Sequence, residues 1–81
     1  MYRLTTDEQS SAQIAALPAE ALVSYAEIVG VLGLIPWQGK PTNGEKPDAP
    51  VRALAFGGLM ATYLILEDQL RVDIVDVLWI D

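Results

Sequence analysis

The sequence predicts an α+β domain in which an N-terminal helical hairpin packs on an antiparallel β-meander of three to four strands. Two observations support this fold class. Apolar residues recur at helical spacing up to Leu34, whereas from Val51 onward the pattern is that of strands joined by short turns. A chain of 81 residues has room for one core, so we expect residues 1–81 to form a single domain.

The first helix is predicted from its start signals. Thr5 and Thr6 each stand three residues before a glutamate or a glutamine, which is the spacing of a capping box. Apolar residues follow at helical spacing, and the helix should end near Leu17. The sequence also allows a short edge strand at residues 2–4, ahead of this helix.

The second helix is more apolar than a small core requires. It should have Pro18 in its first turn and stop before Pro36. Its polar residues form one narrow stripe, Glu20, Ser24 and Glu27. The apolar run after this stripe is too short to cross a bilayer, so either the first helix and the sheet enclose the helix or a partner covers it. The expected partner-binding residues on this helix are Ile28, Val31 and Leu32.

Residues 36–50 hold four of the five prolines and should form a loop. Long loops in compact domains often carry function, and this one contains Lys40, Lys46 and Trp37. Tryptophan packs well both in cores and at the centres of protein interfaces. Trp37 and Trp79 are therefore candidates either for the core or for partner binding.

Three strands are expected after the loop, at residues 51–56, 59–67 and 71–80, with turns at Gly57-Gly58 and Asp68-Gln69. In the last strand, alternation places Val72, Ile74, Leu78 and Ile80 on one face and Val75, Val77 and Trp79 on the other. Asp73 and Asp76 then point to opposite faces and cannot act as a paired acid and base. Both faces of the sheet are apolar, so one should bind the helices and the other should be partly covered or bind a partner.

Composition excludes several kinds of site. The chain has no cysteine and no histidine, so we expect no disulfide, no metal site and no cofactor. The formal net charge of −6 is shared evenly by residues 1–50 and 51–81, which disfavours direct binding to nucleic acid. The N-terminus lacks the pattern of a signal peptide and no segment reads as a membrane span, so we expect a cytoplasmic location and no membrane partner.

Three segments together resemble the RelE/ParE toxin superfamily. They are Pro-Trp-Gln-Gly at 36–39, Arg-Ala-Leu-Ala-Phe-Gly-Gly-Leu-Met-Ala-Thr-Tyr-Leu-Ile at 52–65, and Arg-Val-Asp-Ile-Val-Asp-Val-Leu-Trp-Ile at 71–80. The order of elements matches over nearly the whole chain. The resemblance implies a toxin of a bacterial type II toxin–antitoxin pair, which an antitoxin segment neutralises by wrapping around it. RelE-like members resemble ribosome-dependent mRNA endonucleases, whereas ParE-like members act on DNA gyrase without nuclease activity.

The basic residues of the RelE-like branch are poorly matched. Their positions fall near Ala55, Met60, Trp79 and Ile80. Only Tyr63 and, as a weaker match, Arg52 remain, with Arg71 as the other cation of the strand region. Phosphodiester cleavage needs cations that stabilise the developing charge, so these departures favour a protein without catalytic activity.

The leading hypothesis is a toxin-like component that acts through protein–protein contact, or a degenerate member that keeps the fold and the partner surface. Its partner would be a cognate antitoxin, another protein or a second copy of the chain. One alternative is an mRNA interferase whose catalytic candidates are Arg52, Tyr63 and Arg71, supported by Lys40 and Lys46. Another is a small structural interaction module.

Overall fold

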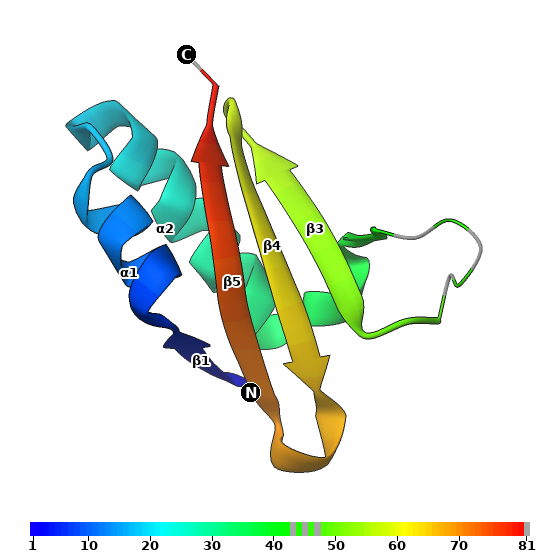
Figure 1. Cartoon of the computed structure of the whole chain (residues 1–81). Helices are drawn as coiled ribbons and strands as arrows, with labels where there is room; N and C mark the ends of the chain where they lie inside the picture. Colours follow the sequence, from blue (N-terminus) through cyan, green and yellow to red (C-terminus); the bar gives the residue numbers. More distant parts are fainter. Residues whose placement is uncertain (43, 45, 47, 81) are drawn as a thin grey trace.

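The computed structural model describes residues 1–42, 44, 46 and 48–80, and it confirms the α+β fold class. In chain order the elements are β1 (Arg3–Thr6), α1 (Glu8–Ala15), α2 (Ala19–Leu34), the 3₁₀ turn η1 (Pro36–Gln38), β2 (Lys40–Pro41), β3 (Val51–Phe56), β4 (Leu59–Leu66), the 3₁₀ turn η2 (Glu67–Gln69) and β5 (Arg71–Trp79). Both helices lie on the same side of the sheet (Figure 1). None of the described helices covers the opposite side of the sheet.

The five strands form one mixed sheet in the order β1-β5-β4-β3-β2. β3, β4 and β5 make the expected antiparallel meander, whereas β1 runs parallel to β5, with Arg3 opposite Arg71 and Thr6 opposite Ile74. With β2, the antiparallel part has the four strands that the sequence allowed, and β1 is the short edge strand, which begins at Arg3 instead of Tyr2. The alternation of apolar and polar residues along a strand does not show with which distant strand it pairs, so the sequence did not indicate that β1 pairs with β5.

The proline-rich segment is less irregular than expected. η1 and β2 take up its first part, and β2 pairs antiparallel with β3, with Lys40 opposite Ala53. For Asn43, Glu45 and Pro47 the loop prediction lies outside the described residues. The segment thus supplies a fifth strand that covers only the first half of β3.

Two glycines reverse the chain between β3 and β4, as predicted. Gly57 and Gly58 have φ of 58° and 84°, a region that residues with side chains rarely adopt. The turn also approaches α2 closely, because a Cβ on Gly57 would stand 2.4 Å from the Ser24 Oγ. The turn therefore requires glycine for its backbone and a small residue on the helix that it touches.

The first helix has a different capping box from the two predicted ones. Asp7 is the N-cap: its carboxylate accepts the Ser10 backbone N–H at 2.7 Å, and the Ser10 hydroxyl accepts the Asp7 N–H at 3.0 Å. Thr5 and Thr6 belong to β1 instead. The hydrogen bonds from Ser10 hold the pKa of Asp7 below its usual range. The Ser10 hydroxyl also donates to the Ile74 carbonyl oxygen at 2.8 Å, which fixes the start of α1 against β5.

One face of α2 forms the core with β4 and β5. The buried helix residues are Ala21, Ser24, Ile28 and Leu32, and the buried sheet residues are Leu59, Ala61, Tyr63, Ile65, Val72, Ile74 and Val77. Burying one large aliphatic side chain contributes about 1.5–3 kcal/mol, so this layer is the main source of stability. The expected polar stripe was wrong at Ser24, which lies on the same helix face as Ala21 and Ile28. Glu20 and Glu27 are exposed, as expected.

A β-bulge changes the two faces of the last strand. Tyr63 pairs with Ile74 but Thr62 pairs with Asp76, so Val75 is an extra residue in β5. Val77 is consequently buried on the same face as Ile74, where alternation had placed it on the other. A bulge is not visible in a pattern of alternating residues.

The bulge also overturns the prediction for the two aspartates of β5. Asp73 pairs with Leu64 and Asp76 pairs with Thr62, two residues on the same face of β4. The carboxylates therefore share a face of the sheet. Each has partners of its own: Arg71 is bound to Asp73, and the Gln13 amide donates to Asp76 at 2.8 Å.

Candidate functional site

Tyr63, the best match to a catalytic residue, is a core residue. It projects from β4 toward the helices and is completely buried. Its hydroxyl donates to the Pro36 carbonyl oxygen at 2.6 Å, and burial raises the pKa of the phenol above its ordinary value. A buried, neutral phenol engaged with the backbone stabilises η1 and cannot take a proton from a substrate at neutral pH.

Arg52 also belongs to this part of the structure. It is opposite Tyr63 in the sheet register, and its guanidinium lies 4.8 Å from the centre of the Trp37 ring. One guanidinium nitrogen donates to the Gly39 carbonyl oxygen at 2.9 Å and to that of Trp37 at 3.2 Å. Arg52 therefore stabilises the turn after α2.

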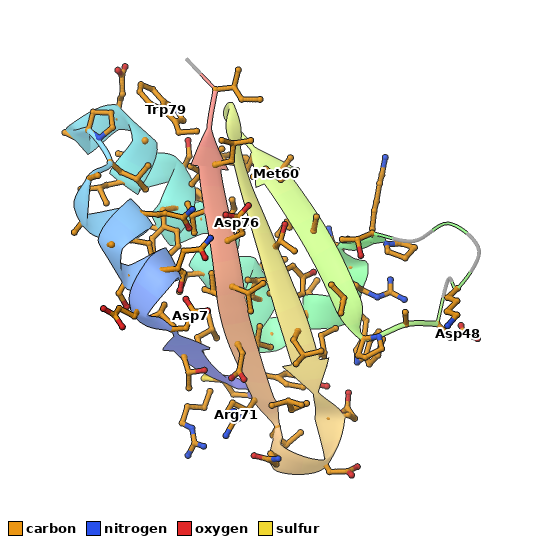
Figure 2. All side chains as sticks on the ribbon, viewed as in Figure 1. Asp7, Asp48, Met60, Arg71, Asp76 and Trp79 are labelled. Carbon is orange, nitrogen blue, oxygen red and sulfur yellow. The ribbon has the colours of Figure 1, made fainter. Side chains whose placement is uncertain are left out.

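Arg71 lies on the other side of the sheet, so the three catalytic candidates do not converge. Its partner in β4 is Leu66, on the face away from the helices, and its Nε is 2.8 Å from the Asp73 Oδ1. A hydrogen bond from Thr5, followed by that from Arg71, holds the pKa of Asp73 below its usual range. Figure 2 shows Arg71 near one end of β5 and Met60 toward the opposite end of the sheet.

Lys40 and Lys46 do not complete a catalytic centre. Lys40 is exposed in β2, opposite Ala53, and Lys46 is exposed in the loop that follows. Among the described residues there is also no group of acidic side chains suited to a metal ion. No helix in the described part of the chain is both long enough and apolar enough to cross a membrane.

A hydrogen-bonded cluster that the sequence did not predict surrounds Glu67. Its carboxylate accepts the Trp37 indole N–H at 2.6 Å and the Tyr2 hydroxyl at 2.7 Å. These two hydrogen bonds, the one from Trp37 first, hold the pKa of Glu67 below its usual range. The cluster joins the N-terminus, η1 and the β4–β5 turn. Because these segments are far apart in sequence, no local sequence pattern predicts the contact.

Two of the three partner-binding residues predicted on α2 are core residues. Ile28 and Leu32 are completely buried in the chain's own core, so they cannot be contact residues for a partner of this fold. Val31 is half-buried. The periodicity identified an apolar helix correctly but did not indicate which of its faces the sheet would cover.

The surplus of apolar surface expected on α2 is present, but at other residues than the three predicted ones. The exposed apolar face of α2 contains Leu22, Val23, Leu34 and the adjacent Ile35, and Val23 and Leu34 are 66% and 65% exposed. Leu22 and Val23 lie near the start of α2 and Leu34 and Ile35 near its end, with the exposed Glu27 between them, so this face is apolar at both ends and is not one continuous patch. Their spacing opposite the buried residues is the signal from which this face can be found.

The two tryptophans lie between core and surface. Trp37 is 39% exposed and is held by Glu67 and Arg52. Trp79 is half-buried and packs against the core, near the end of β5 (Figure 2). Both rings keep an accessible edge that a partner can contact.

Two hollows lie beside β3. One, of about 290 Å³, is between β3 and α2 and is lined by Glu27, Val31 and Phe56 among others. The other, of about 450 Å³, is lined by Lys40 and Met60 among others. The two hollows and the apolar face of α2 offer apolar surface near this edge of the sheet.

No known family model matches the sequence, and no curated protein matches it in sequence. Solved structures do match. The chain aligns with a chain of the intact Escherichia coli RelBE toxin–antitoxin complex at a TM-score of 0.81 and 13% identity, over 100% of this chain and 99% of that one. It aligns with the isolated E. coli RelE toxin at a TM-score of 0.73 and 17% identity, over 100% of this chain and 86% of that one. It aligns with a chain of the RelBE2 toxin–antitoxin complex from Mycobacterium tuberculosis at a TM-score of 0.78 and 21% identity, over 98% of this chain and 91% of that one. The chain therefore has a RelE-like toxin fold.

Proposed function

We propose that this protein is the toxin-like component of a bacterial type II toxin–antitoxin pair and acts in the cytoplasm through protein–protein contact. The observation that carries the proposal is the likeness, over the whole chain, to a structure of a toxin–antitoxin complex. The exposed apolar face of α2 supports it, because an unbound chain would leave Val23 and Leu34 in water. An antitoxin is the partner that this fold implies.

Contact with a protein is preferred to cleavage of mRNA on the geometry of the cationic residues. Tyr63 is buried, Arg52 is bound to backbone carbonyl oxygens, and Arg71 is paired with Asp73 on the opposite face. These groups do not meet at one place where a phosphate can be held, and the net charge of −6 opposes the approach of RNA. We therefore propose a protein that is not a nuclease and does not bind nucleic acid directly.

Expression in a bacterial host tests the proposal. We expect growth arrest that co-expression of the neighbouring small reading frame relieves, with no new 5′ ends when a defined message is probed by primer extension. New 5′ ends that vanish in Tyr63→Phe would instead establish the interferase. Normal growth together with a bound partner would identify a degenerate member, and normal growth without a partner would contradict the toxin–antitoxin assignment.

Matched variants connect the phenotype to the surface. Leu34→Glu places a charge on the exposed apolar face of α2, whereas Gln69→Glu places the same charge on an exposed turn at η2. Leu34→Glu should abolish co-purification with the partner while the circular dichroism spectrum stays unchanged, and Gln69→Glu should have no effect. Equal co-purification of both variants would exclude this face from the contact.

A further inference from the structure

The edge of the sheet at β3 is only partly covered. β2 pairs with Arg52 and Ala53, and within the described residues no strand pairs with the rest of this edge, from Leu54 to Phe56. An uncovered edge offers backbone donors and acceptors to another chain. This part of β3 is therefore a place where the sheet can be extended.

The hydrogen-bond pattern shows which backbone groups are available there. The Val51 carbonyl oxygen accepts the Thr42 N–H from the side of β2. Along a strand, the backbone N–H and C=O groups of successive residues point alternately to the two neighbouring strands. Ala53 and Ala55 therefore direct these groups to the same side as Val51, toward β2 and away from β4. Ala53 is opposite Lys40, but Ala55 lies beyond the end of β2. Ala55 is an exposed residue, and in this register its donor and acceptor point away from β4, toward the uncovered edge.

The two hollows lie on opposite sides of this free edge. Leu54 and Ala55 line both of them. Successive side chains of a strand point to opposite faces of its sheet. A strand added beside Ala55 would therefore direct alternate side chains into the hollow next to α2 and into the hollow on the open face.

Charge indicates what the added strand should carry. Residues 4–39 contain four acidic residues and no lysine or arginine, so the whole helical layer is acidic. Within this layer Glu27 lines the hollow next to α2 and has no ion pair among the described residues. On the open face, the second hollow is lined mainly by apolar groups such as Ala53 and Met60; Lys40 also lines it, so an apolar side chain suits this hollow and a cationic one does not. A second copy of the chain is a poor occupant, because each copy carries a net charge of −6.

We infer that the free edge of β3 is a docking site for an extended segment of a partner protein, which adds a strand to the sheet. The residue opposite Ala55 has an apolar side chain that enters the hollow on the open face. A neighbouring lysine or arginine faces Glu27. The inference rests on the proposed function, since it locates where the partner of this toxin-like fold binds. The hollow next to α2 also adjoins the apolar face of that helix, because Glu27 and Val31 line both the hollow and the surface beside Leu34.

Titration of the isotope-labelled protein with a short synthetic peptide tests the inference by NMR. The peptide, blocked at both ends, has a central valine flanked by lysines within a threonine-rich strand. We expect shifts in the amide signals of Leu54, Ala55 and Phe56. The control peptide differs only by an N-methyl group on the central valine, which removes one ladder hydrogen bond and leaves the charge unchanged. It should bind about two- to tenfold more weakly, from the loss of that one backbone hydrogen bond.

Two protein variants separate the site from general attraction between opposite charges. Glu27→Gln should weaken peptide binding about two- to fivefold, as expected for one exposed ion pair, whereas Glu20→Gln removes the same charge elsewhere on α2 and should leave it nearly unchanged. Equal binding of both peptides, shifts confined to other residues, or no binding would overturn the inference. So would concentration-dependent dimerisation through residues 54–56, seen by sedimentation. Growth arrest and co-purification do not depend on these peptides, so the proposed function can hold even if this docking site fails.

Discussion

Replacing Gly39 with alanine should destabilise the protein through one specific contact. Gly39 lies against the buried ring of Tyr63, and a Cβ at position 39 would stand 1.9 Å from the Tyr63 Oη. It would also stand 2.9 Å from the Tyr63 Cζ and from the Ala53 carbonyl oxygen. The backbone of Gly39 has φ of −63°, which any residue adopts, so the cost comes from the collision alone.

The magnitude follows from what must move. The Tyr63 ring is fully buried, and its hydroxyl is held by the Pro36 carbonyl oxygen at 2.6 Å. Overpacking a core costs about 1–3 kcal/mol, and displacing a buried hydrogen bond adds about 1 kcal/mol. We therefore expect Gly39→Ala to lower the free energy of unfolding by about 3 kcal/mol, which corresponds to a Tm roughly 10–20 °C lower for a domain of this size.

Urea denaturation, followed by tryptophan fluorescence, measures this change and identifies its cause. Tyr63→Phe removes the Oη and should cost about 1 kcal/mol by itself. In that background Gly39→Ala should cost at least about 1 kcal/mol less than in the wild type, because its nearest clash is gone. An unchanged urea midpoint for Gly39→Ala, or an equal cost in both backgrounds, would refute the reasoning.

Three further changes test other contacts. Ser10→Ala should lower the free energy of unfolding by about 1–2 kcal/mol, because it removes half of the capping box and the link to β5; an equal cost for the exposed Ser11→Ala would contradict this. The hydrogen bonds from Trp37 and Tyr2 lower the pKa of Glu67 from its ordinary 4.5, so their stabilisation is complete above that pH and is lost as the pH falls through the lowered value of the folded protein. As the pH is lowered, the urea midpoint of Glu67→Gln should accordingly fall less steeply than that of the wild type. The same dependence of the urea midpoint on pH in both proteins would contradict the assignment. Trp37→Ala should cost about 1–2 kcal/mol, less than a fully buried tryptophan, because its ring is 39% exposed; thermal stability equal to that of the wild type would show that the ring contributes nothing.

The sequence was informative wherever structure is set by neighbours along the chain. The end of α2 before Pro36, the Gly57-Gly58 turn and the three strands of the meander all depend on local backbone preferences or on alternation, and the structure confirms them. The capping box was assigned to the wrong residues because Asp7, Thr5 and Thr6 are all acceptable N-caps. The choice among them depends on β1, which takes up the two threonines.

The remaining features depend on contacts between distant segments. Whether Ile28 or Val23 faces the core is decided by where the sheet lies, and a helix that is apolar on most of its surface does not specify this. The bulge at Val75 and the hydrogen bonds to Glu67 likewise arise only when separate elements meet. The candidate catalytic residues illustrate the same point. Tyr63 and Arg71 are polar residues that the sequence alone allows to share one site, but in the fold they lie on opposite faces of one sheet.

The parallel pairing of β1 with β5 determines when this protein can complete its sheet during its synthesis. β1 precedes both helices in the chain, yet among the described residues it pairs with β5, the strand of this sheet that is translated last. Until then the helical hairpin also has no complete sheet to cover Ile28 and Leu32, so the nascent chain exposes apolar surface that chaperones recognise. Closing the sheet requires both ends of the chain to meet, a slow, non-local step. The complete sheet therefore forms only after β5 has been translated.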